Sequence, residues 1–202
     1  MQGGVTNRHE LRRRATRDAL REAAMAKFTE RGFDRVSVAE IAAEVGVTER
    51  TFYRHFPTKE AVLFHDYHQR LEWLTAALAL RPTTESIFDS VAAALRSFPE
   101  DVEVVRQIAL LRSSLISSQR AADHLRVIEA AFSAVFEEHF RKRYSDHPDV
   151  DLLAVVAGNA MAGATVGAVD AWGQRGCVDD IEEMVEKAVA FLRAGLDVDA
   201  VS

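Results

Sequence analysis

Residues 37–59 constrain the fold more than any other stretch, because they specify two short helices joined by a tight turn. Ser37 and Glu40 have the spacing of a capping box, which satisfies backbone donors at the start of a helix. Gly46 ends this helix, since glycine readily adopts the left-handed conformation that follows many helices. Thr48 has the side chain of an N-cap for a second helix. The stretch therefore predicts a helix-turn-helix.

The side chains on the outer faces of the second helix suit DNA. Phe52 and Phe56 lie one turn apart and should point inward. Arg50 could reach O6 and N7 of guanine in a major groove, and nearby hydroxyl, imidazole and ammonium groups could bind phosphates. A solvated helical hairpin is the alternative. The residues expected to contact DNA are Ser37, Thr48, Glu49, Arg50, Thr51, Tyr53, His55 and Lys59, with Ser37, Tyr53, His55 and Lys59 on phosphates.

A resemblance to a known family covers residues 16–63. The chain here contains the run A-A-M-A-K-F-T-E-R-G-F-D-R-V-S-V-A-E-I-A-A-E-V-G-V-T-E-R-T-F-Y-R-H-F-P-T-K-E-A-V-L. This run closely resembles the DNA-binding domain of TetR-family transcriptional regulators, and the other two thirds of the chain show no comparable match. The resemblance implies a larger C-terminal helical domain for ligand binding and dimerisation, but it does not imply which effector binds.

Helical periodicity continues along the chain and strand-like alternation is absent, so we predict an all-α protein of about nine helices. A three-helix DNA-binding domain is expected at residues 1–60, beginning with a mobile basic arm at residues 1–12. This arm could touch phosphate or the minor groove, or it could be a solvated tail. A ligand-binding and dimerisation domain is expected at residues 61–202. The first helix should run from Thr16 to Arg31, and a long fourth helix from Lys59 to about Leu80.

Charge is divided unevenly between these two parts. The net charge of −6 is unusual for a DNA-binding protein. However, residues 1–60 hold 12 Lys and Arg against 9 Asp and Glu, a net charge of +3, and residues 61–202 hold 13 against 22, a net charge of −9. The basic part is the part with the helix-turn-helix. A single cysteine, Cys177, and a polar N-terminus without a secretory signal predict a reducing, cytoplasmic location.

Residues 152–169 carry no charge and approach the length of a membrane span. We favour a soluble helix, because the segment is mostly alanine and glycine and includes Asn159. Its small side chains would let another helix approach closely, so this helix and the last one could pair with the same two helices of a second chain. Burial of both within one monomer is the alternative. The expected dimer interface contains Ala160, Gly163, Gly167, Met184, Ala188, Phe191 and Leu192.

No catalytic motif is present: the chain lacks a glycine-rich phosphate loop, G-x-S-x-G, H-E-x-x-H and CxxC. His65, Asp66 and His68 do not complete a metal site, so no metal and no cofactor are expected. The aromatic side chains of the larger domain instead predict an apolar cavity for a small molecule. The residues expected to line it are Tyr67, Phe88, Leu111, Phe132, Phe136, Asn159 and Trp172.

These patterns favour a dimeric regulator, not an enzyme, that binds a palindromic DNA operator and represses transcription. A small apolar or amphipathic effector would release it, and the predicted fourth helix is the candidate moving element. One alternative is a ligand-independent dimeric DNA-binding protein. A C-terminal domain without a cavity would favour this alternative. The other is a helical small-molecule-binding protein or enzyme with an unused helix-turn-helix.

Overall fold

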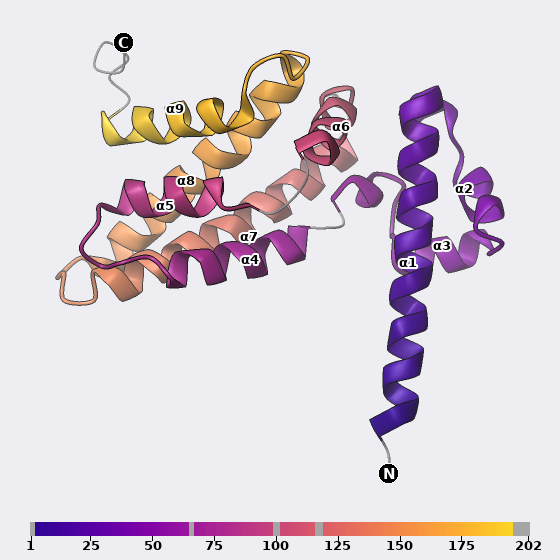
Figure 1. Ribbon diagram of the computed structural model, residues 1–202, viewed down its shortest axis with the longest axis horizontal. Helices are drawn as coiled ribbons and strands as arrows, with labels where there is room; N and C mark the ends of the chain where they lie inside the picture. The colour runs from indigo at the N-terminus through magenta and orange to yellow at the C-terminus, as the bar shows by residue number, and fades with distance from the viewer. Residues whose placement is uncertain (1–2, 65–66, 99–101, 116–118, 196–202) are drawn as a thin grey trace. The chain divides into compact units, whose positions relative to one another are not determined.

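The computed structural model describes residues 3–64, 67–98, 102–115 and 119–195. In these ranges the chain forms nine α-helices and two 3-10 helices and contains no strand, which confirms the all-α class (Figure 1). The helices fall into two compact units, Met1–His65 and Asp66–Ser202. The division lies within a few residues of the expected boundary at residue 60.

The first unit follows the local signals of the sequence. Gly32 and Gly46 follow the first two α-helices with φ angles of 81° and 71°, in the left-handed region that glycine tolerates best. Thr58 caps the last element, because its Oγ1 accepts a hydrogen bond from the Ala61 N–H at 3.2 Å. The elements are α1 (Gly3–Arg31), η1 (Phe33–Arg35), α2 (Val38–Glu44), α3 (Glu49–His55) and η2 (Glu60–Phe64).

A small hydrophobic core holds these elements together. Its members are buried to 6% exposure or less and include Leu20, Phe28, Phe33, Ile41, Phe52 and Phe56. Val45 and Val47, the apolar residues on either side of Gly46, are only half-buried. Ion pairs from Lys27 to Glu44 and from Arg31 to Glu40 also join α1 to α2, but their exposure limits each to less than about 1 kcal/mol.

Two predictions about this unit are wrong. The basic stretch at residues 1–12 is helical from Gly3 onward, because its arginines, leucine and glutamate favour a helix that α1 can simply continue. Thr16 therefore does not cap a helix; its hydroxyl donates to the Arg12 carbonyl at 2.9 Å, inside α1. Also, the long fourth helix does not begin at Lys59, since η2 occupies Glu60–Phe64 and α4 begins at Tyr67.

The second unit is a bundle of longer helices. It contains α4 (Tyr67–Ala79), α5 (Ile87–Arg96), α6 (Val102–Ser113), α7 (Gln119–Arg143), α8 (Val150–Gln174) and α9 (Ile181–Arg193). Helix α8 packs against α6, α7 and α9. The main core lies among α4, α5, α7, α8 and α9 and includes Leu74, Val91, Phe136 and Met161. A smaller cluster forms around Trp172, where α6 meets the end of α8.

Glycines let α8 approach its neighbours closely. A Cβ at Gly158 would lie 3.0 Å from the backbone of α7, and a Cβ at Gly173 would lie 2.6 Å from the Ala109 carbonyl oxygen of α6. Helix α8 is also long and apolar enough to cross a membrane, with a mean hydropathy of 1.8. Its inner face packs against three other helices, and a third of this apolar stretch is buried. Its exposed face still presents Leu152, Val155 and Val156.

Candidate functional site

The start of α2 is fixed by the expected capping box. The Ser37 Oγ accepts from the Glu40 N–H at 3.2 Å and donates to the Glu40 carboxylate at 2.9 Å. That carboxylate also accepts from the Ser37 N–H at 2.8 Å and from Arg31. The Ser37 N–H, followed by the Arg31 and Ser37 side chains, lowers the pKa of Glu40 to about 2. The Ser37 hydroxyl is therefore hydrogen-bonded within the protein. The residue is nevertheless exposed, as a residue that binds a phosphate must be.

The start of α3 is fixed in the same way by Thr48. Its Oγ1 accepts from the Thr51 N–H at 3.2 Å and lies 3.1 Å from the Thr51 Oγ1. These bonds set the direction in which α3 leaves the turn. Glu49 and Arg50, the first two residues of the helix, are exposed. Arg50 has no hydrogen bond or ion pair in the part of the chain that the structure describes, so its guanidinium can bind an external acceptor.

The inner face of α3 anchors this surface. Phe52 is fully buried and its ring lies 5.5 Å from that of Phe56. Tyr53 packs the edge of its ring against Phe52, with centroids 5.6 Å apart, and remains 50% exposed. Arg54 is exposed one turn after Arg50. The outer face of α3 therefore presents Arg50, Tyr53 and Arg54 on a rigid base, and residues i and i+4 lie on one face of a helix.

Lys59, a predicted phosphate contact, is bound by groups within the first unit. Its ammonium donates to the carbonyls of Phe33 and Val36, at 2.9 and 3.0 Å, and lies 4.1 Å from the centre of the Phe33 ring. Two of its three N–H donors are thus used to hold the η1 segment against the end of the unit. This side chain therefore stabilises the unit, and its contact with a phosphate stays a prediction.

His55 is also turned away from a phosphate role. Both of its ring nitrogens are buried and have no hydrogen-bond partner. Burial lowers the pKa of His55, and the charges of Arg54, Arg13 and Arg17 lower it further. The imidazole is therefore neutral near pH 7. Its position explains the correction, because His55 lies on the side of α3 that meets α1, whereas its neighbour Arg54 is exposed.

The structure brings together most of the residues expected at the DNA-contacting surface. Thr48, Glu49, Arg50, Thr51 and Tyr53 lie on the first turns of α3 or at its cap. Arg54 was not predicted as a contact residue, although its spacing of four from Arg50 was a sufficient signal.

A separate cavity of about 180 Å³ lies among the six helices of the second unit. Its wall is mainly apolar and includes the rings of Trp73, Phe98 and Phe132. The Trp73 and Phe98 rings meet edge-on, with centroids 4.8 Å apart. The Arg70 guanidinium carbon lies over the Phe98 ring, 5.3 Å from its centroid. Thr165 on the wall donates its hydroxyl to carbonyls within α8. The cavity can hold a small, largely apolar molecule.

Only two of the residues predicted to line a cavity do so, namely Tyr67 and Phe132. Phe136 is fully buried in the main core, and Phe88 packs against that core. Trp172 belongs to the smaller cluster, where its Nε1 donates to the Asp179 carbonyl at 2.8 Å. Asn159 is exposed and donates to the Val155 carbonyl within α8, and Leu111 lies outside the wall. The prediction was wrong because core and cavity aromatics have the same helical spacing.

A groove of about 820 Å³ runs between α8 and α9. Six of the seven residues expected at a dimer interface line it: Gly163, Gly167, Met184, Ala188, Phe191 and Leu192. The seventh, Ala160, is exposed on α8. A Cβ at Gly163 or Gly167 would meet no atom within 4 Å, unlike one at Gly158. This face of α8 is open, so dimerisation through it stays a prediction.

Residues with metal-binding or redox chemistry do not gather at either site. His65 and Asp66 lie outside the described residues, and the described ranges hold no group of three or more His, Cys, Asp or Glu side chains that could bind a metal ion. Burial raises the pKa of Cys177, whose thiol lies in the cluster around Trp172 and is therefore a poor nucleophile.

Residues 20–65 match the model of the family described as bacterial regulatory proteins, tetR family. The regulator TcmR of Streptomyces glaucescens is 37% identical over 84 residues, which cover 42% of this chain and 37% of TcmR. The chain thus matches little more than a third of that relative's length. The transcriptional regulator MftR of Mycobacterium tuberculosis is 26% identical over 92% of this chain and 93% of that protein.

Solved structures resemble the whole chain. FadR of Thermus thermophilus, a TetR-family transcriptional repressor crystallised with lauroyl-CoA, superposes with a TM-score of 0.66 over 90% of this chain and 95% of that one. The two sequences are 22% identical, so this likeness concerns the fold. It extends to the helical bundle that follows the helix-turn-helix.

Proposed function

The chain belongs to the TetR family of bacterial regulatory proteins, and on this premise we propose that it is a DNA-binding transcriptional repressor released by a small molecule. The observation that carries the proposal is the outer face of α3. There, Thr48 sets the direction of the helix, Phe52 anchors it, and Arg50 and Arg54 point outward without a partner in the described residues. A guanidinium at the start of such a helix suits guanine in a major groove.

The open face of α8 and the groove beside α9 support a homodimer. This surface combines the exposed side chains of Leu152, Val155 and Val156 with uncovered glycines. An isologous dimer would bury it and carry two copies of α3. Their separation would need to be ~34–36 Å to enter successive major-groove faces of a palindromic operator in the cytoplasm.

The cavity among α4 to α9 supports a response to an effector. An engineered apolar cavity of ~150 Å³ in another protein admits benzene, so a volume of about 180 Å³ suits one ring or a short chain. The cavity also speaks against a ligand-independent protein with a filled core. An effector would release the DNA only if it binds the non-operator state more tightly.

The test of DNA binding begins with the duplex that the purified protein selects from a random pool. Arg50→Ala should weaken binding to this duplex by ~1–3 kcal/mol and relax its preference over a shuffled duplex. Glu22→Ala, an exposed change on α1, serves as the control. A wild-type protein that selects no sequence and binds no duplex at low salt would refute the proposal.

The test of effector binding uses single-ring aromatic compounds and short fatty acids as probes. A compound that occupies the cavity should raise the midpoint of thermal unfolding in proportion to its affinity. Val166→Phe would fill the cavity from its α8 wall and should abolish that rise. If the filled variant shows the same rise as wild type, the compound binds elsewhere and the cavity is not the effector site.

A further inference from the structure

Helix α1 continues well beyond the core that it covers. The segment of α1 before Thr16 extends past α3 in Figure 1, and every residue from Arg8 to Ala15 is exposed. Leu20, by contrast, is fully buried against the rest of the unit. These eight residues therefore have no role in forming the hydrophobic core.

The face of α1 that turns toward the unit changes its chemistry along the helix. Arg13, Arg17, Leu20, Ala24 and Phe28 follow one another at intervals of four, three, four and four residues, the spacing of a single helical face. The last three are buried under α2 and α3. The same face is therefore apolar where it meets the core and cationic where it passes the end of α3.

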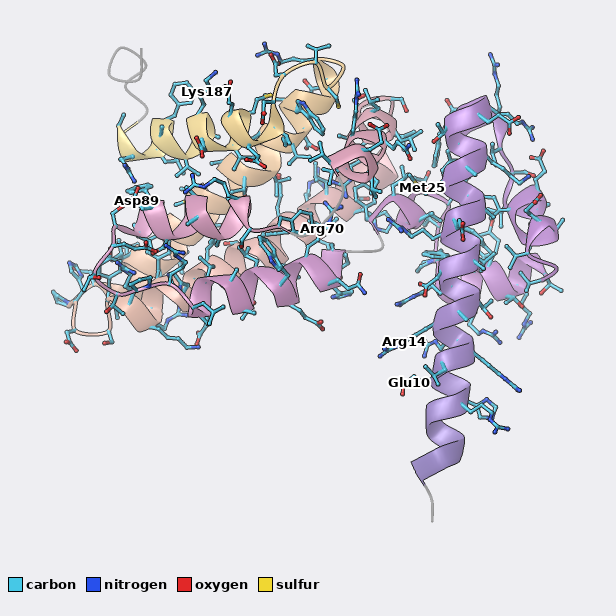
Figure 2. All side chains as sticks on the ribbon, in the orientation of Figure 1. Glu10, Arg14, Met25, Arg70, Asp89 and Lys187 are labelled. Carbon is cyan, nitrogen blue, oxygen red and sulfur yellow. The ribbon has the colours of Figure 1, made fainter. Side chains whose placement is uncertain are left out.

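The cationic part of this face meets the last turn of α3. Arg13 and Arg17 from α1 and Arg54 from α3 all lie near enough to His55 for their charges to lower its pKa, after burial as the main cause. None of the three arginines has an ion pair or hydrogen bond from its guanidinium within the described ranges. Glu10 precedes Arg13 by three residues, but no ion pair joins the two within the described ranges, and Figure 2 shows the Glu10 and Arg14 side chains to the left of α1. Three like charges thus gather without a carboxylate partner.

We propose that Arg13, Arg17 and Arg54 form a phosphate-binding track that extends the DNA-contacting surface of α3 along α1. The proposal rests on the proposed function, since the occupant is the backbone of the same duplex that α3 enters. Like charges held together repel each other, and a row of phosphates would neutralise them. Guanidinium groups also match phosphate oxygens in bidentate geometry. The track would add affinity without reading sequence.

The experiment measures the salt dependence of binding to the duplex selected from a random pool. Each phosphate contact contributes a slope of about −0.9 to a plot of log affinity against log salt concentration. Arg13→Ala with Arg17→Ala should therefore reduce the magnitude of the slope by about 1.8 and keep the preference over a shuffled duplex. Alanine favours a helix, so α1 should remain intact. Arg13→Lys with Arg17→Lys should restore most of the slope, because lysine keeps the charge.

The matched control is Arg8→Ala with Arg12→Ala, which removes the same charge from the opposite face of α1. It should leave the slope close to that of wild type. An unchanged slope in the Arg13 and Arg17 variant, or an equal loss in the control, would overturn the track. If Arg50→Ala still relaxes sequence preference in that case, the proposed function stands alone. If the wild-type protein binds no DNA, or if the arginines bind anionic phospholipid vesicles and not DNA, the track fails as well.

Discussion

The two units of this protein position their functional side chains by different physical means. In the first, caps and glycines within a few residues set the direction of α3, and one buried phenylalanine fixes its rotation. In the second, six helices far apart in sequence must pack before the cavity exists. A surface for DNA can thus be specified locally, whereas a cavity for a small molecule is a property of the whole bundle.

The largest expected effect tests how much of the first unit depends on the anchor of α3. Phe52→Ala removes a fully buried ring from a small core and should lower the free energy of unfolding by ~3–5 kcal/mol. Leu11→Ala, at a side chain that is 60% exposed on α1, is the control and should change stability little. Urea unfolding followed by circular dichroism provides both values. Comparable losses in the two variants would show that α3 is not anchored through Phe52.

The next effect compares a part-buried lysine of the first unit with one that forms an exposed ion pair. Lys59→Met leaves the Phe33 and Val36 carbonyls without their charged donor and should cost ~1.5–3 kcal/mol in unfolding free energy. Lys27→Met, which breaks an exposed pair with Glu44, should cost less than about 1 kcal/mol. If Lys59→Met is as stable as wild type but has a shallower salt slope for DNA binding, Lys59 is a phosphate ligand after all.

The third effect is a loss of ~1–3 kcal/mol in unfolding free energy in the second unit. Here the helices packed against α8 determine whether a glycine can be replaced by a larger residue. Gly158→Ala would force its Cβ against the backbone of α7, and overpacking of this kind destabilises a fold. Gly163→Ala meets open space in the monomer and should not destabilise it, because alanine favours a helix. Urea unfolding compares the two folds, and sedimentation of Gly163→Ala shows whether this face carries the dimer contact. Equal destabilisation by both changes would contradict the distinction.

The same contrast explains what could be predicted from the sequence. The capping box at Ser37, the cap at Thr48 and the glycine stop at Gly46 act over three or four residues, so the helix-turn-helix was predictable almost residue by residue. Lys59 and His55 were not, because their partners lie on η1 and α1, far away in sequence. The extent of α1 was missed because the helix was predicted to begin at Thr16.

In the second unit, helix positions were predictable from periodicity but burial was not. Phe132 and Phe136 occupy adjacent turns of α7, yet one lines the cavity and the other is fully buried in the core. Phe98 and Trp73 line it from different elements, and no local signal marks either side chain. The small residues of α8 were predicted to allow close helix packing. Which of them face α7 or α6 and which remain open depends on where those two helices lie.

The smallest effect concerns His55, a residue of α3 whose pKa depends on arginines of α1 that are far away in sequence. Its pKa lies below its ordinary value of 6.5, through burial first and then through the charges of Arg54, Arg13 and Arg17. The unfolded chain therefore binds a proton more readily than the folded unit does. The contribution of His55 to stability is intact above pH 6.5 and declines as the pH falls from there toward the folded pKa.

Arg13→Ala with Arg17→Ala removes two of these causes and leaves the larger one, burial, in place. The pKa of His55 should rise part of the way toward 6.5, and the loss of stability below that pH should become smaller than in wild type. The imidazole is half-buried, so solvent screens the arginine charges and keeps the change modest. An NMR titration of the His55 ring protons measures it directly. An unchanged midpoint would mean that these arginines do not gather at the end of α3, and the phosphate track would then lose its geometric basis.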